Sequence, residues 1–219
     1  MTLYLGCPSI TVMSSARLIE RVSVRTVLIQ ALTYTSTFSI LMCLIGCGKP
    51  FNVKEPNLPP AGYAGKTSVG KVDVQAEAIT DEDFLYYSFD ANLIAAGVLP
   101  VRVMLTNSGN QDVGLQKARF EIRPPQGRAT AAVDARQAFK RLISYYEIKA
   151  YNKSGYKKSL EAFSSYALDV KSPLAGGQSR QGLVFFLTSS ESARVVGLTL
   201  LITRLSSAES REAIELKLN

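Results

Sequence analysis

The chain contains no histidine and no tryptophan among its 219 residues. Without an imidazole, it cannot build a Ser-His-Asp or Cys-His nucleophilic site, nor most zinc sites, which use histidine ligands. A Ser-Lys pair or a pair of carboxylates are the hydrolytic arrangements that remain. The sequence therefore predicts a protein that is not an enzyme and has neither a cofactor nor a metal site. A hydrolase with a Ser-Lys or carboxylate site is the alternative.

Cysteine is scarce as well. Cys7, Cys43 and Cys47 all lie within the first 47 residues, so the remainder of the chain cannot form an internal disulfide. Missing disulfides are typical of a reducing compartment, although bacterial envelope proteins also often lack them. The composition, 47% hydrophobic and 20% charged, is typical of a folded globular protein.

The amino-terminal segment has the layout of an export signal. Arg17, Arg21 and Arg25 precede the stretch 26–48, which contains no charged residue. A basic flank followed by an apolar run is typical of a signal peptide, and its densest apolar part is 38–46. Because all three arginines follow Met13, translation could start there or at Met1. The alternative is an uncleaved signal anchor that crosses the membrane once.

Residues 44–47, Leu-Ile-Gly-Cys, resemble the lipobox of bacterial lipoproteins. This resemblance implies a signal peptide over 1–46 that is cleaved before Cys47, whose thiol receives a diacylglycerol. The membrane partner would then be reached through this lipid anchor. By analogy with lipoproteins of diderm bacteria, Gly48 after the cysteine implies an outer-membrane location facing the periplasm.

Proline and glycine dominate the next stretch, at positions 50, 56, 59, 60, 62 and 65. Such a composition favours an extended, flexible chain over a helix or the interior of a sheet. The sequence therefore predicts a lipidated cysteine and tether over 47–68, followed by a folded domain over 69–219.

Within that domain, apolar and polar residues alternate with the period of β-strands. Residues 71–79, KVDVQAEAI, place valine and alanine on one face and acidic residues or glutamine on the other. In 98–107, the same alternation places Arg102 opposite Val101 and Val103. The pattern predicts strands over 71–79, 98–107, 118–123, 182–187, 194–202 and 212–218. Turn-forming residues follow at 107–110 and 124–127.

One stretch, 131–146, has the spacing of an amphipathic helix and is expected to be inserted among the strands. The acidic group 81–83 lacks the ligand spacing of a calcium loop and is interpreted as a solvated turn. Strands of this length, joined mostly by turns, favour a mainly β protein built as an antiparallel sandwich.

Two segments resemble telokin-like, immunoglobulin-like domains of bacterial lipoproteins. Residues 99–115 are similar to their strand ending in an Asn-rich turn, and residues 174–187 to their glycine-bearing turn before a buried aromatic strand. The resemblance implies an immunoglobulin-like antiparallel β-sandwich with one inserted helix, preceded by a cleaved signal peptide and a Pro/Gly-rich tether.

Basic residues gather in one part of the chain. The segment 128–158 holds eight bases and two acids, whereas 72–90 holds six acids and no base. Tyrosine supplies flat apolar faces for sugars or proteins, and lysine attracts anions. The sequence therefore predicts a partner-binding surface for an envelope protein or an anionic glycan, and not for nucleic acid. Alternatively, the tyrosines pack inward while the lysines lie in water. The candidate residues are Tyr145, Tyr146, Lys149, Tyr151, Lys153, Tyr156, Lys157 and Lys158.

Taken together, these patterns predict a lipid-anchored envelope protein that serves as a binding or structural module. The alternatives are the lipid-anchored hydrolase and the single-span, signal-anchored envelope protein.

Overall fold

The computed structural model describes residues 51–58, 62–148, 152–188, 197–205 and 213–218, all within one unit of the chain, residues 49–219. The signal peptide expected over 1–46 and the lipidation site Cys47 lie outside the described residues. Within these residues, no helix has the length and apolar character needed to cross a membrane.

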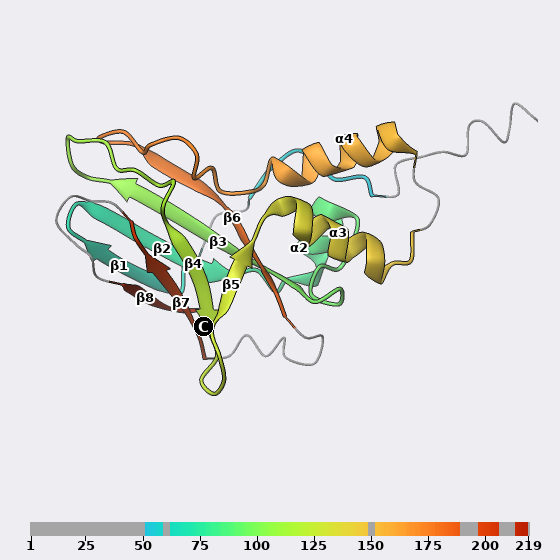
Figure 1. Ribbon diagram of the computed structural model, residues 1–219, viewed down its shortest axis with the longest axis horizontal. Helices are drawn as coiled ribbons and strands as arrows, with labels where there is room; N and C mark the ends of the chain where they lie inside the picture. Colours follow the sequence, from blue (N-terminus) through green and yellow to red (C-terminus); the bar gives the residue numbers. More distant parts are fainter. Residues whose placement is uncertain (1–50, 59–61, 149–151, 189–196, 206–212, 219) are drawn as a thin grey trace, which may run out of the picture. The chain divides into compact units, whose positions relative to one another are not determined.

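The strands of the described residues form one antiparallel sheet of eight, in the order β1-β2-β3-β6-β5-β4-β7-β8. Their bounds are β1 Gly65–Val69, β2 Val72–Ala78, β3 Val98–Asn107, β4 Arg119–Arg123, β5 Thr130–Val133, β6 Ser179–Leu187, β7 Leu198–Thr203 and β8 Ile214–Leu218. The mainly β class and the antiparallel pairing are thus confirmed. The two facing sheets of a sandwich are replaced by one continuous sheet (Figure 1).

This sheet curls until its first and last strands lie together. A Cβ placed on Gly65 of β1 would lie 2.7 Å from the carbonyl oxygen of Lys217 and 3.0 Å from the Cβ of Leu216, both in β8. Only a residue without a side chain allows two backbones to approach so closely. The result is a nearly closed, curled sheet with an apolar interior.

The period-two pattern explains which side chains fill that interior. In β2, buried and half-exposed residues alternate from Val72 to Ala78, as predicted. In β8, Ile214, Leu216 and Leu218 are buried and the residues between them are exposed. Members of this inner cluster include Val72, Val74, Ala76, Val101, Val103, Phe120, Ile122, Leu168, Val184, Phe186, Leu200, Ile202 and Leu216.

The predicted strands are confirmed with small shifts of their ends, and the strand expected over 194–202 is described over 198–203. The turn expected over 107–110 is also present. The Asn107 side chain supports it, because its Oδ1 accepts a hydrogen bond from the Gly109 N–H and its Nδ2 donates to the carbonyl oxygens of Gln111 and Leu174.

Three helices are described: α2 Glu82–Phe89, α3 Ala135–Tyr145 and α4 Lys153–Ser164. They lie at the same end of the sheet (Figure 1). Each begins after a side chain that accepts a backbone hydrogen bond from the first turn, provided by Asp81, Asp134 and Asn152 respectively. Such caps satisfy N–H groups that have no partner inside the helix.

Three expectations therefore need correction. The sequence predicted one inserted helix, whereas the described residues contain three. The acidic group 81–83 is not a solvated turn, because Asp81 caps α2 and the next two residues form its first turn. The helix expected over 131–146 begins only at Ala135, after the cap, and residues 130–133 form strand β5.

The helices pack on the sheet through a second apolar group, the helical cluster. The Phe163 ring of α4 stacks on Phe185 of β6, with centroids 4.9 Å apart. The rings of Phe89 and Phe139 each lie 5.5 Å from the Phe163 ring. Members include Phe51, Leu85, Phe89, Leu93, Phe139, Leu142, Phe163, Tyr166, Leu183 and Phe185.

The segment expected to be a tether is largely part of this unit. Phe51 is 4% exposed, and its ring lies 6.1 Å from that of Phe139. Its carbonyl oxygen accepts a hydrogen bond from the Ser159 hydroxyl, and that of Glu55 accepts one from the Tyr166 hydroxyl. Residues 65–68 belong to β1. The prediction of a flexible tether is therefore wrong for residues 51–58 and 65–68.

Candidate functional site

A gap in the curled sheet lies beside the short strand β5. Two residue pairs join β5 to β4 (Glu121 with Ala131, Ile122 with Thr130), and two join β5 to β6 (Ala132 with Phe186, Val133 with Phe185). Because β4 continues to Arg119 and β6 continues to Ser179, the two strands run on without β5 between them.

The chain after α4 replaces β5 along the edge of β6. The Leu168 N–H donates to the Leu183 carbonyl oxygen, and the Leu183 N–H donates to that of Tyr166. A Cβ on Gly182 would lie 2.4 Å from the Cα of Leu168, so the glycine permits this close approach. The Gln116 side chain, just before β4, donates to the Lys171 carbonyl oxygen and closes the far end of the gap.

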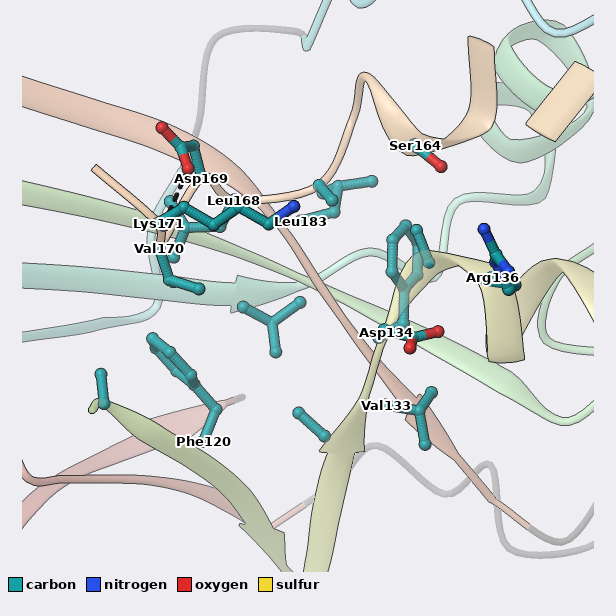
Figure 2. Close-up of a pocket in the computed structure, with 16 residues that line it drawn as sticks. Phe120, Val133, Asp134, Arg136, Ser164, Leu168, Asp169, Val170, Lys171 and Leu183 are labelled. Carbon is teal, nitrogen blue, oxygen red and sulfur yellow. Dashed lines mark hydrogen bonds between the residues drawn. The ribbon is translucent and has the colours of Figure 1, made fainter. Parts of the chain in front are cut away.

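The gap forms a pocket with a volume of about 480 Å³. Its walls are mostly apolar and come from β4, β5, β6 and the segment 167–171 (Figure 2). Phe120, Leu168 and Val184 belong both to these walls and to the inner cluster, so the pocket reaches the apolar interior. Its volume lies within the range of small-molecule sites, roughly 300–1,000 Å³.

Two acids at the mouth of the pocket already accept hydrogen bonds from backbone N–H groups. Asp134 caps α3 by accepting a hydrogen bond from the Gln137 N–H. Asp169 accepts a hydrogen bond from the Lys171 N–H, which is the main reason that the pKa of its carboxyl is lowered. Its other oxygen lies 3.8 Å from the Arg180 guanidinium.

The bases at the mouth are Arg136 and Lys171. Both side chains are exposed, and neither makes an ion pair within the part of the chain that the structure describes. Figure 2 shows them on different sides of the pocket, Lys171 beside Leu168 and Arg136 near Asp134. An apolar pocket with two available cations at its mouth suits a ligand that has an apolar body and an anionic group.

The groups that a hydrolase needs also occur at this pocket. Ser164, Lys171, Asp134 and Asp169 all line it. Within the described residues, no hydrogen bond joins the Ser164 hydroxyl to the Lys171 ammonium, and no cluster of three or more metal-ligating side chains occurs.

The predicted tyrosine and lysine surface is divided by the fold. The Tyr146 hydroxyl accepts a hydrogen bond from the Asn92 N–H at 3.0 Å, and burial raises the pKa of this hydroxyl. The rings of Tyr146 and Phe51 lie 5.7 Å apart, and those of Tyr156 and Phe139 lie 5.5 Å apart. These two tyrosines therefore pack against the helical cluster.

The remaining candidates differ in position. Lys153, Lys157 and Lys158 are exposed on α4, where Lys157 lies 3.7 Å from Glu161. Tyr145 is 46% exposed at the end of α3. Lys149 and Tyr151 lie outside the described residues.

The fold brings Tyr145 together with two tyrosines of α2 that the sequence did not single out. Tyr86 and Tyr87 are 53% and 61% exposed. The Tyr86 side chain lies near the Tyr146 hydroxyl and, besides burial, contributes to the raised pKa of that hydroxyl, and the rings of Tyr146 and Tyr145 lie 5.0 Å apart. The Lys54 ammonium lies 3.1 Å from the centroid of the Tyr87 ring. We call Tyr86, Tyr87, Tyr145 and Lys54 the tyrosine patch.

Comparison with known proteins adds little. No protein-family model matches the chain, and no curated protein matches it. A functionally unknown protein from Listeria monocytogenes EGD-e aligns over 70% of this chain and 80% of that chain, with 9% identity and a TM-score of 0.37. So distant a likeness carries no argument about fold or function.

Proposed function

We propose that the chain is a lipid-anchored protein of the bacterial envelope that binds a small amphipathic anion in the pocket beside β5, without catalysing a reaction. The observation that carries this proposal is the combination of apolar walls and a basic mouth in one open pocket of about 480 Å³. The lipobox resemblance supports attachment at Cys47 and an outer-membrane location facing the periplasm.

The apolar walls provide the main driving force for binding. An alkyl chain that enters the pocket replaces water at Phe120, Leu168 and Val184. Each methylene group transferred from water to such surroundings contributes about 0.8 kcal/mol. Ligands with a longer apolar body should therefore bind more tightly until the pocket is filled.

The basic mouth selects the head group. Arg136 and Lys171 can each donate a charge-assisted hydrogen bond to a carboxylate or phosphate. The nearby Asp134 and Asp169 already accept backbone hydrogen bonds, so they compete less for these cations. The proposed ligand, a small molecule with an apolar body and an anionic head group, thus differs from the anionic glycan or envelope protein that the sequence suggested.

Ligand binding is tested with the purified full chain and dansyl-undecanoic acid, whose fluorescence rises in apolar surroundings. We expect saturable binding that the double variant Arg136→Gln/Lys171→Gln weakens by about tenfold or more, the effect of losing charge-assisted hydrogen bonds. The matched control is Lys153→Gln/Lys158→Gln, which removes two exposed lysines of α4 and should leave affinity unchanged.

A third variant tests the apolar walls. Ala118→Phe adds a ring at the pocket edge and should reduce dansyl-undecanoic acid binding while the circular dichroism spectrum stays unchanged. Binding that survives both the Ala118→Phe and the Arg136→Gln/Lys171→Gln changes would contradict the proposed site.

Lipid attachment is tested separately in cells grown with labelled palmitate. The wild-type chain should incorporate the label, and Cys47→Ser should remain an unlabelled precursor of higher mass. Cys43→Ser serves as the matched control and should be labelled normally. Label retained by Cys47→Ser would overturn the anchor assignment, and an unlabelled wild-type chain that keeps residues 1–46 would support the membrane-spanning alternative.

A further inference from the structure

The helical end of the unit exposes large apolar surface at one place. Among the described residues, four large hydrophobic side chains are exposed, and Tyr86, Tyr87 and Tyr145 are three of them. Isolated exposed apolar side chains are ordinary, but a group of neighbouring ones marks an interaction surface. Tyr146 links the two helices, α2 and α3, because its ring lies 5.0 Å from the Tyr145 ring and its hydroxyl accepts a hydrogen bond from the Asn92 N–H just after α2.

The tyrosine patch surrounds the place where the chain enters the unit. The Asn52 N–H donates to the Asp90 carboxylate just after α2, and the Lys54 N–H donates to the Ser88 carbonyl oxygen within α2. Phe51, immediately before them, is buried between α3 and α4. The first described residues are therefore fixed beside the patch.

The length of chain between the anchor and this entry point is short. Four residue steps separate Cys47 from Phe51. An extended chain spans at most about 3.6 Å per residue, so an acyl group on Cys47 limits Phe51 to within about 14 Å of the membrane surface. Because Phe51 is fixed in the helical cluster, the same limit keeps the helical end near the lipid head groups.

We propose that the tyrosine patch rests on the phospholipid surface and orients the unit with its helical end toward the membrane. This inference depends on the lipid attachment at Cys47 proposed above. Tyrosine is enriched at membrane interfaces because its ring is apolar and its hydroxyl remains hydrated. Lys54 can extend its ammonium from the Tyr87 ring to lipid phosphates while its alkyl stem covers apolar surface.

The absence of tryptophan makes a direct test feasible, because a single introduced indole is then the only one in the chain. The lipidated full chain carrying Tyr87→Trp is reconstituted into vesicles of phosphatidylethanolamine and phosphatidylglycerol with brominated acyl chains, which quench indole fluorescence by contact. We expect this tryptophan to lose roughly half of its emission, as for an interfacial aromatic residue.

The matched control places the reporter at the other end of the sheet. Gln111 is exposed in the turn after β3, a strand that runs from the helical cluster at Val98 to Asn107 (Figure 1). Gln111→Trp should keep its emission in the same vesicles. Adding Tyr86→Glu and Tyr145→Glu to Tyr87→Trp should restore most of the lost emission, with an unchanged circular dichroism spectrum.

The outcomes separate the two proposals. If mass spectrometry shows the lipid on Cys47 and Tyr87→Trp keeps its emission, the orientation is wrong while the anchor stands. Equal quenching of Tyr87→Trp and Gln111→Trp also overturns the orientation. If Cys47 carries no lipid, the anchor fails and the orientation fails with it.

Discussion

Replacing Glu77 with alanine should lower the free energy of unfolding by about 3–5 kcal/mol, the usual cost of removing one partner from a buried ion pair. Glu77 of β2 and Arg102 of β3 are register partners and form a salt bridge, with side chains 13% and 5% exposed. The Tyr63 ring lies 5.9 Å from the Arg102 guanidinium. The alanine variant leaves this guanidinium buried without its carboxylate.

A double substitution separates the effect of the two charges on stability from the effect of the volume that the side chains fill. Glu77→Leu with Arg102→Met removes both charges and keeps apolar volume, so its stability should lie close to that of the wild-type chain. The matched control is Glu215→Ala, because Glu215 and Arg123 form a pair that is about half exposed on both sides. Its loss should cost less than about 1 kcal/mol. Urea unfolding followed by circular dichroism measures all three, and equal costs for Glu77→Ala and Glu215→Ala would refute the expectation.

Replacing Phe163 with alanine should cost about 3–5 kcal/mol, as for other large aromatic residues removed from a core. Phe163 is fully buried and stacks on Phe185, with an angle of 24° between the ring planes. It also contacts Phe89 of α2 and, together with Tyr156, connects α4 to Phe139 of α3. Its removal leaves a cavity where α2, α3, α4 and β6 meet.

Urea unfolding also measures the cost of Phe163→Ala against that of two comparison variants. Phe163→Leu fills most of the space and should cost clearly less than Phe163→Ala. Tyr87→Ala removes an aromatic ring that is 61% exposed, so it should cost at most about 1 kcal/mol, including the loss of its contact with Lys54. If Phe163→Ala is no more harmful than Tyr87→Ala, the helical cluster does not stabilise the fold as described.

Strands with one buried face could be predicted from the sequence, because burial alternates with the same period as the side chains. β2 and β8 are the clearest cases. In β3 the strand was predicted correctly but the environment of Arg102 was not, since Tyr63 and Glu77 cover the outer face there. Alternation along one strand contains no information about what lies on its outer face.

Helix α4 was not predicted, although its sequence contains a short apolar stripe. Tyr156, Leu160 and Phe163 are spaced as on one face of a helix, and all three belong to the helical cluster or pack against it. The buried positions Gly155 and Ser159 are small and weaken this stripe, and the tyrosines and lysines of the segment were interpreted as a binding surface instead. For α2, the acids that start the helix suggested a turn, because the same residue types favour both turns and helix caps.

The candidate site depends on contacts between distant parts of the chain. The cations at its mouth, Arg136 and Lys171, come from α3 and from the segment after α4, and the pocket exists because β5 ends early between β4 and β6. A strand of four residues leaves no signal that a gap follows it. Tyr145 was found from its own segment, whereas Tyr86 and Tyr87 come near it only because the chain after α2 and the end of α3 meet, at the hydrogen bond between Asn92 and Tyr146.

The contact of β1 with β8 protects the two outermost strand edges from pairing with other molecules. Acylated proteins are confined to two dimensions, so they meet one another more often than the same molecules in solution. At each encounter an open strand edge can pair with the edge of another molecule, which leads to aggregation. Here Gly65 brings the two outermost strands so close that each shields the other from a foreign strand. A bulky residue at position 65 would separate them and expose two templates for self-association, which the proposed lipid anchor would confine to the plane of the membrane.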